Sequence, residues 1–210
     1  MNDRDWRALH GGLLLIFAPL PTLLPGLMRW PWHFAVPLFA YAVVVLLVSP
    51  LRRTFAWLRV GRLDGRVLAV SCGIVLIASA ALLLFQSLFN PDLAHLRALF
   101  PTTSGSQLLL FGVFFSLLNT LLEELVFRGV LQDALESQFR PVTALLLQAV
   151  IFGIAHYQGY PMGALGVVLA AIYGLMLGWL RNWVGGLAAP VLVHVFADAT
   201  IFAMVVADSR

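Results

Sequence analysis

Apolar residues form long runs along almost the whole chain, and short polar stretches separate them. A helix that crosses a bilayer needs roughly 20 mostly apolar residues. By this measure the pattern predicts hydrophobic segments at 11–28, 33–50, 67–89, 107–127, 142–158, 162–180 and 185–206. Because the first segment contains Pro19, Pro21 and Pro25, we expect it to be kinked or partly interfacial.

The polar stretches between these segments carry signals of their own. Residues 90–106, which contain Asn90-Pro91 and a TTSGS run, predict an exposed loop. Residues 128–141 predict an amphipathic surface helix that ends at Pro141. Taken together, the pattern predicts an all-α fold, a polytopic transmembrane bundle of about six to eight helices.

The composition supports a membrane protein. Of the 210 residues, 61% are hydrophobic and 11% are charged, whereas a soluble domain carries about 25% charged residues. The surroundings of such a chain must therefore be a bilayer. The length allows one integrated domain, in which residues 1–104 hold no motif and residues 105–206 hold the candidate chemistry.

Every basic residue is an arginine, and several lie in one short connection. Since positive charge is retained on the cytoplasmic side, the cluster between the second and third segments predicts a cytoplasmic loop. Its members are Arg52, Arg53, Arg59, Arg62 and Arg66. Arg4 and Arg7 place the N-terminus on the same side. The net charge of +3 reflects these membrane edges and forms no basic face with aromatic platforms, so we expect no nucleic-acid partner.

Once the loops are set aside, few ionisable side chains remain at membrane depth. A charge at the bilayer centre costs about 2.5–3.5 kcal/mol or more unless it is paired or hydrated, so such residues are functional candidates. They are Glu123, Glu124, Arg128, His156, His194 and Asp198. At about 1.5 Å per residue, Glu123, His156 and His194 fall roughly 18, 21 and 14 Å from the cytoplasmic edge, so they can meet in one pocket.

Helical spacing sorts these candidates. Glu124 and Arg128 are four residues apart and predict an ion pair that supports the neighbouring Glu123. Glu123 points about 100° away from Glu124 and stays free to face a cavity. Two further pairs share a helix face by the same spacing, Phe152 with His156 and His194 with Asp198.

Two carboxylates and two imidazoles on three helices suit the activation of water. In one arrangement Glu123 takes a proton from water and His156 orients that water, while His194 and Asp198 line the far side. In the other arrangement, Glu123, His156 and His194 bind one divalent metal, for which zinc is the first candidate. They leave one coordination position open for water. The residues leave both arrangements open, and both suit hydrolysis of an amide bond inside the membrane.

The motifs resemble those of a known family. EELVFR at 123–128 is similar to an EExxxR motif, FGIAH at 152–156 to FxxxH, and HVFAD at 194–198 to HxxxN/D. Their order and separation resemble the CAAX-protease and bacteriocin-processing (CPBP) family of intramembrane endopeptidases, over residues 105–200. The HExxH, GxSxG and GxGD signatures of other protease classes are absent from the sequence.

The resemblance implies an all-helical fold with a catalytic cavity that opens toward the cytoplasm. It implies that Glu123 activates water, that His156 assists, and that His194 with residue 198 stabilises the oxyanion or holds a metal. The implied supporting residues are Glu124, Arg128 and Phe152. Many members carry Asn where this chain has Asp198. An ionised aspartate cannot donate a hydrogen bond, so Asp198 must be protonated, bind a metal or orient a histidine.

The leading hypothesis is an intramembrane endopeptidase, either glutamic-type or a metalloprotease, that acts on a membrane-embedded protein or peptide. Arginine-only basic usage and short loops predict a multi-pass protein of a bacterial inner membrane. An ion-coupled transporter is the second hypothesis, but it requires internal repeats with broken helices, and the two halves of this chain differ. The third is a catalytically inactive scaffold or immunity protein of the same fold.

Overall fold

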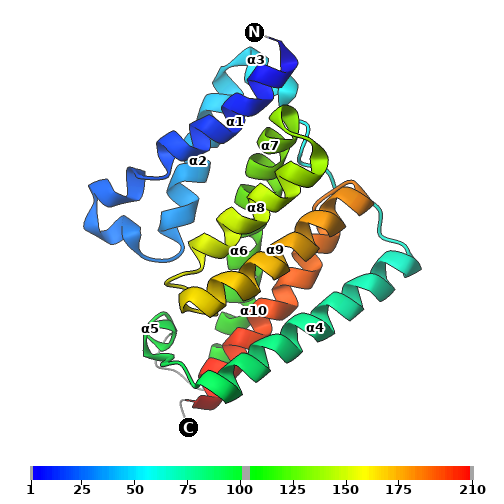
Figure 1. Cartoon of the computed structure of the whole chain (residues 1–210). Coiled ribbons are helices and arrows are strands. Elements are labelled where there is room, and N and C mark those ends of the chain that lie inside the picture. The colour runs from blue at the N-terminus through cyan, green and yellow to red at the C-terminus, as the bar shows by residue number, and fades with distance from the viewer. Residues whose placement is uncertain (1, 101–104, 209–210) are drawn as a thin grey trace.

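The computed structural model describes residues 2–100 and 105–208, and over these residues the protein is all-helical without β-strands. Its helices are α1 (Asp3–Phe17), α2 (Trp32–Leu47), α3 (Ser49–Thr54), α4 (Gly65–Phe89), α5 (Ala94–Arg97), α6 (Ser106–Glu124), α7 (Gln132–Gln138), α8 (Pro141–Ala155), α9 (Gly163–Val184) and α10 (Ala188–Asp208). Two 3-10 turns, η1 (Leu20–Leu23) and η2 (Pro25–Met28), follow α1, and a π-helical segment, η3 (Leu125–Leu131), joins α6 to α7. The predicted fold class is confirmed (Figure 1).

Long apolar helices identify a multi-pass membrane protein. Among the described residues, four helical stretches are long and apolar enough to cross a membrane, namely Gly65–Phe89, Ser106–Gln138, Gly163–Val184 and Ala188–Asp208. The apolar helices α2 and α8 are shorter. The loop predicted at 90–106 contains α5, and its residues 101–104 lie outside the described residues.

The helix boundaries at the N-terminus differ from the prediction. No single element covers 11–28: α1 begins earlier and ends at Phe17. The prolines that follow direct the chain into η1 and η2, since proline lacks the amide hydrogen that would continue an α-helix.

The prediction of an amphipathic surface helix at 128–141 is wrong. This stretch continues α6 through η3 into α7, so one helical column runs over Ser106–Gln138. Gln132 and Asp133 are buried because α1 and α8 pack against α7. The polarity that suggested contact with water marks contact between helices instead: Arg7 of α1 pairs with Asp133 at 2.7 Å.

Four helices form the centre of the molecule. Figure 1 shows α6, α8, α9 and α10 together, with α4 along one side and α1 and α2 on the other. α10 packs on α4 and α6, and α8 packs closely on α9. A Cβ added at Gly153 would lie 2.5 Å from Val167 O, and one at Gly174 would lie 2.9 Å from the Phe152 side chain. Glycine at these positions therefore allows the close approach of α8 and α9.

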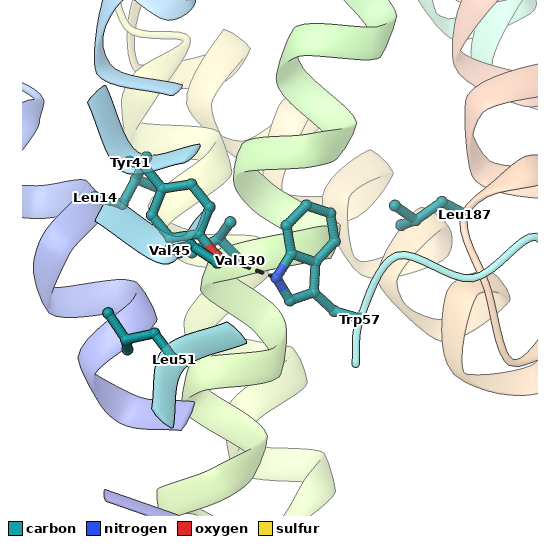
Figure 2. Close-up of a cluster of buried hydrophobic side chains, with 7 residues drawn as sticks. All are labelled: Leu14, Tyr41, Val45, Leu51, Trp57, Val130 and Leu187. Atoms are coloured by element: carbon teal, nitrogen blue, oxygen red, sulfur yellow. Dashed lines mark hydrogen bonds between the residues drawn. The ribbon is translucent and has the colours of Figure 1, made fainter. Parts of the chain in front are cut away.

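A cluster of buried apolar side chains fastens the N-terminal helices to the centre. Its members, drawn in Figure 2, are Leu14, Tyr41, Val45, Leu51, Trp57, Val130 and Leu187. Since Val130 and Leu187 belong to the C-terminal half, this cluster contains side chains from both halves of the chain. The Trp57 indole N–H donates to the Tyr41 hydroxyl oxygen at 3.3 Å inside this cluster (Figure 2).

Candidate functional site

Glu123, His156 and His194 come from different helices, and the structure brings their side chains together. Glu123 Oε2 lies 3.8 Å from His156 Nε2 and 3.8 Å from His194 Nε2. The three side chains are mostly buried: Glu123 is 10% exposed, His156 16% and His194 4%. Their predicted meeting in one pocket is confirmed.

His156 is held at the end of α8. It follows the last helical residue, Ala155, and its Nδ1 lies 2.8 Å from Phe152 O. With its proton on Nδ1, the ring donates to this carbonyl and presents Nε2 toward Glu123. Phe152 is fully buried, and its ring centroid lies 4.3 Å from that of His156. The predicted pairing of these two residues on one face is confirmed.

Glu124 has one partner more than the sequence predicted. Its Oε1 lies 2.9 Å from Arg128 Nη1, which confirms the predicted ion pair, and both side chains are fully buried. The same oxygen accepts a hydrogen bond from His194 Nδ1 at 2.7 Å. Arg128 also lies over the Phe152 ring, 4.1 Å from its centroid. Glu124 therefore anchors His194 and leaves its Nε2 facing Glu123.

The π-helical segment η3 begins directly after the two glutamates. Segments of this kind interrupt α-helices frequently at functional sites. Here two adjacent residues reach opposite nitrogens of one imidazole: Glu124 bonds Nδ1 of His194, and Glu123 lies near Nε2. The site thus has an anchoring carboxylate and a second one that faces the two rings.

Asp198 lies near the same nitrogen of His194 as Glu123 does. Its Oδ1 is 3.8 Å from His194 Nε2. Its Oδ2 accepts hydrogen bonds from Thr120 Oγ1 at 3.0 Å and from Asn119 Nδ2 at 3.1 Å. Two donors on one oxygen suit an ionised carboxylate, because that group only accepts. The nitrogen of His194 that is fixed by a carboxylate is Nδ1, bonded to Glu124, so Asp198 is not the anchor of this ring.

Several residues of the site escaped the sequence analysis. Asn119 bonds both Glu123 and Asp198, and the indole of Trp30 donates to Asn119 Oδ1 at 3.1 Å. Asn119 precedes Glu123 by four positions in an otherwise apolar helix, which is a signal that helical spacing could have found. Nothing in the sequence linked Trp30 to this helix, since its surroundings, RWPWHF, fit an interfacial aromatic belt.

A cavity of about 980 Å³ opens in front of these groups. Apolar side chains from α4, α6, α9 and α10 form much of its wall. The start of α2 at His33 and the end of α8 at His156 also line it. Both helices are shorter than the four candidate membrane spans, and backbone that leaves a helix is tolerated within a membrane where it lines a water-filled cavity.

The donors here only partly fit a metal. Each histidine is bonded through Nδ1 and leaves Nε2 free, as in many zinc sites. However, Glu123 Oε2 lies 3.8 Å from each Nε2, whereas two ligands of one tetrahedral zinc lie ~3.3 Å apart. Within residues 2–100 and 105–208, no group of three or more His, Cys, Asp or Glu side chains has the geometry of a metal site.

Comparison with known proteins supports the resemblance seen in the motifs. Residues 105–200 match the family model described as type II CAAX prenyl endopeptidase Rce1-like. A segment of 87 residues, 41% of this chain, is 32% identical to the uncharacterized protein YpbD of Bacillus subtilis (strain 168). The match spans only 41% of that relative's own length. No solved structure matches the chain significantly.

Proposed function

With residues 105–200 identified as an Rce1-like region, we propose that this protein is an intramembrane endopeptidase that hydrolyses a peptide bond of a membrane-associated protein or peptide. The family match supports a CAAX-type endopeptidase at the level of the family. The single observation that carries the proposal is the position of Glu123 Oε2, which lies 3.8 Å from Nε2 of both His156 and His194.

In the proposed reaction Glu123 acts as the general base. Its Oε2, which has no hydrogen-bond partner among the described residues, takes a proton from a water molecule that His156 Nε2 orients. The resulting hydroxide attacks the peptide carbonyl carbon, and Glu123 then passes the proton to the leaving amine. General acid–base catalysis of this kind contributes about 10²- to 10⁴-fold in rate.

His194 is the proposed stabiliser of the oxyanion. When both nitrogens are protonated, the ring donates through Nδ1 to Glu124 and directs Nε2–H toward the oxygen that becomes negatively charged. Asp198, whose Oδ1 is 3.8 Å from that nitrogen, compensates the charge of the imidazolium. An ionised aspartate can fill this role, because the role does not require Asp198 to donate a hydrogen bond.

The proposed setting is a bacterial inner membrane with the N-terminus in the cytoplasm. The arginine-rich connection between α3 and α4 supports this orientation by the positive-inside rule. The apolar wall of the cavity suits a substrate that arrives from the lipid, as a membrane-embedded peptide does. We expect no role for nucleic acid.

The proposal is tested by reconstituting the protein in liposomes with a panel of membrane-embedded peptides and measuring cleavage by mass spectrometry. Wild type is compared with Glu123→Gln and His156→Ala, and Asp3→Asn, at an exposed carboxylate outside the site, serves as the matched control. We expect cleavage by wild type and the control and none by the other two variants. Cleavage that survives in both Glu123→Gln and His156→Ala would rule the mechanism out.

A metal-assisted form of the reaction would use the same three side chains as ligands. The free Nε2 atoms of both histidines favour it, and their distances from Glu123 argue against it. Zinc content of the purified protein, measured by elemental mass spectrometry, decides between the two forms. One zinc per chain that is lost in His194→Ala would establish the metal form, whereas full activity after chelation would exclude it.

A further inference from the structure

Among the described residues, Asn119 has the only amide that hydrogen-bonds both Glu123 and Asp198. Its Nδ2 donates to Glu123 Oε1 at 3.0 Å and to Asp198 Oδ2 at 3.1 Å. Its Oδ1 accepts from Trp30 Nε1 at 3.1 Å. An ionised carboxylate can only accept and an indole N–H can only donate, so these partners fix which end of the amide is which.

We call these two hydrogen bonds from the Asn119 amide, to Glu123 and to Asp198, the bridge. It reduces the repulsion between the two carboxylates. Glu123 and Asp198 are two carboxylates in a buried, low-dielectric site, where like charges repel strongly. The two hydrogens of one NH₂ group satisfy one oxygen of each, and Thr120 adds a second donor to Asp198 at 3.0 Å. Because Oε1 of Glu123 is occupied in this way, Oε2 remains as the oxygen that faces the two histidines.

The bridge also joins the two halves of the chain. Trp30 lies between η2 and α2, outside the residues that match the family model. Its ring packs against Phe115 of α6 at a centroid distance of 5.0 Å, one turn before Asn119. Trp30 and Asn119 both line the same cavity as Glu123. The N-terminal segment thus contributes a hydrogen bond to the site as well as part of its wall.

We propose that Asn119, held by Trp30, is a positioning residue that orients the Glu123 carboxylate for catalysis and allows Asp to occupy position 198. The inference rests on the proposed function, because it assigns Glu123 the role of base. It predicts that loss of the bridge lowers kcat and leaves KM nearly unchanged, since Asn119 acts on the base and not on the bound peptide.

The test uses the full-length protein in liposomes with a peptide that wild type cleaves. We expect Asn119→Leu to lower kcat about 10- to 100-fold, as the loss of a hydrogen bond to a charged group would, with KM changed less than about 3-fold. Trp30→Phe keeps the aromatic ring and loses the donor, so its effect is smaller. Ser116→Ala on the same helix and Trp32→Phe on the same segment are the controls, and both retain wild-type kcat.

An exchange of the two polar groups separates positioning from folding. Asn119→Asp places three carboxylates together and lowers kcat below that of Asn119→Leu. Adding Asp198→Asn brings the number of carboxylates at these positions back to two but leaves Glu123 Oε1 without a donor, so the double variant should keep at least the kcat loss of Asn119→Leu. A folded double variant with wild-type kcat would mean that the number of carboxylates matters and the bridge does not, so this comparison decides the question even where Asn119→Leu fails to fold.

Failure of the inference differs from failure of the proposed function. Full kcat in Asn119→Leu, or wild-type kcat in the double variant, overturns the positioning role while an inactive Glu123→Gln leaves the endopeptidase proposal intact. Cleavage by Glu123→Gln overturns both.

Discussion

Two buried groups of polar side chains in this protein each contain histidine. They differ in whether their hydrogen-bonding atoms all have partners. The first lies among the N-terminal helices, where His10 Nδ1 is 2.6 Å from the Tyr41 hydroxyl and Nε2 is 3.1 Å from Thr54 Oγ1. Tyr41 can donate to His10 while it accepts from Trp57, and Thr54 donates in turn to backbone carbonyls. His10 is fully buried, and both of its ring nitrogens have partners.

The second group surrounds Glu123. It contains the carboxylates of Glu123, Glu124 and Asp198 and the guanidinium of Arg128, and Oε2 of both glutamates has no hydrogen-bond partner among the described residues. It also borders the cavity of about 980 Å³. The comparison teaches that a buried histidine by itself says little about function: a closed neutral network holds helices together, whereas unpaired acceptors next to a cavity leave capacity for a reaction.

The largest effect on stability is expected from a substitution that removes one buried charge from the group around Glu123. Arg128→Met removes the arginine partner of the buried Glu124 and leaves it with His194 alone, so we expect a loss of about 3–5 kcal/mol in the free energy of unfolding. Unfolding in detergent micelles, followed by denaturant titration, measures it. Arg140→Met, at an exposed arginine, is the matched control and should change stability little. A cost below about 1 kcal/mol for Arg128→Met would mean that Glu124 does not depend on this pair.

A smaller effect is expected at the contact between the two regions. Gly129 lies in η3 next to Arg128, and a Cβ there would lie 2.6 Å from the ring of Trp57. Gly129→Ala should therefore push Trp57 out of its cluster at a cost of about 1–3 kcal/mol. Gly73→Ala, where a Cβ meets no atom within 4 Å, is the control. Equal melting temperatures for the two variants would show that Trp57 adjusts without cost.

The smallest effect is expected in the neutral group. Tyr41→Phe removes the hydroxyl that His10 and Trp57 share, at a cost of about 1–2 kcal/mol, because both are then left without that partner. Its kcat should equal that of wild type, since none of these residues faces the cavity. The comparison between regions would lose its meaning if Tyr41→Phe lowered kcat as strongly as Asn119→Leu.

Local spacing along the sequence predicted part of this site. The four-residue intervals gave the Glu124–Arg128 pair and placed Phe152 beside His156. They could not give the bond from His194 to Glu124, which joins residues 70 positions apart on helices whose packing the sequence does not encode locally. The sequence analysis also missed the contact of Trp30 with Asn119. An aromatic residue near a segment end fits a membrane interface equally well, so nothing pointed to a role in the site.

The fold was predictable in class and less so in its boundaries. Hydrophobic runs gave a helical membrane protein, since a bilayer admits few other structures. The polarity of residues 128–141 was misinterpreted because partners such as Arg7 lie on a distant helix, so polar side chains indicated contact with water where the structure has ion pairs. The packing of α1 and α8 against α7 depends on such contacts, and the hydrophobic periodicity of the sequence does not predict it.

The central claim is that Glu123 removes a proton from water and forms no bond to the substrate. Cleavage of a membrane peptide in water enriched in oxygen-18, followed by mass spectrometry of both product and recovered protein, tests it most directly. The account predicts one labelled oxygen in the new carboxyl terminus after a single turnover and no label in the Glu123 side chain after many. Label in the Glu123 carboxylate would show that this group attacks the peptide itself, and would contradict the account.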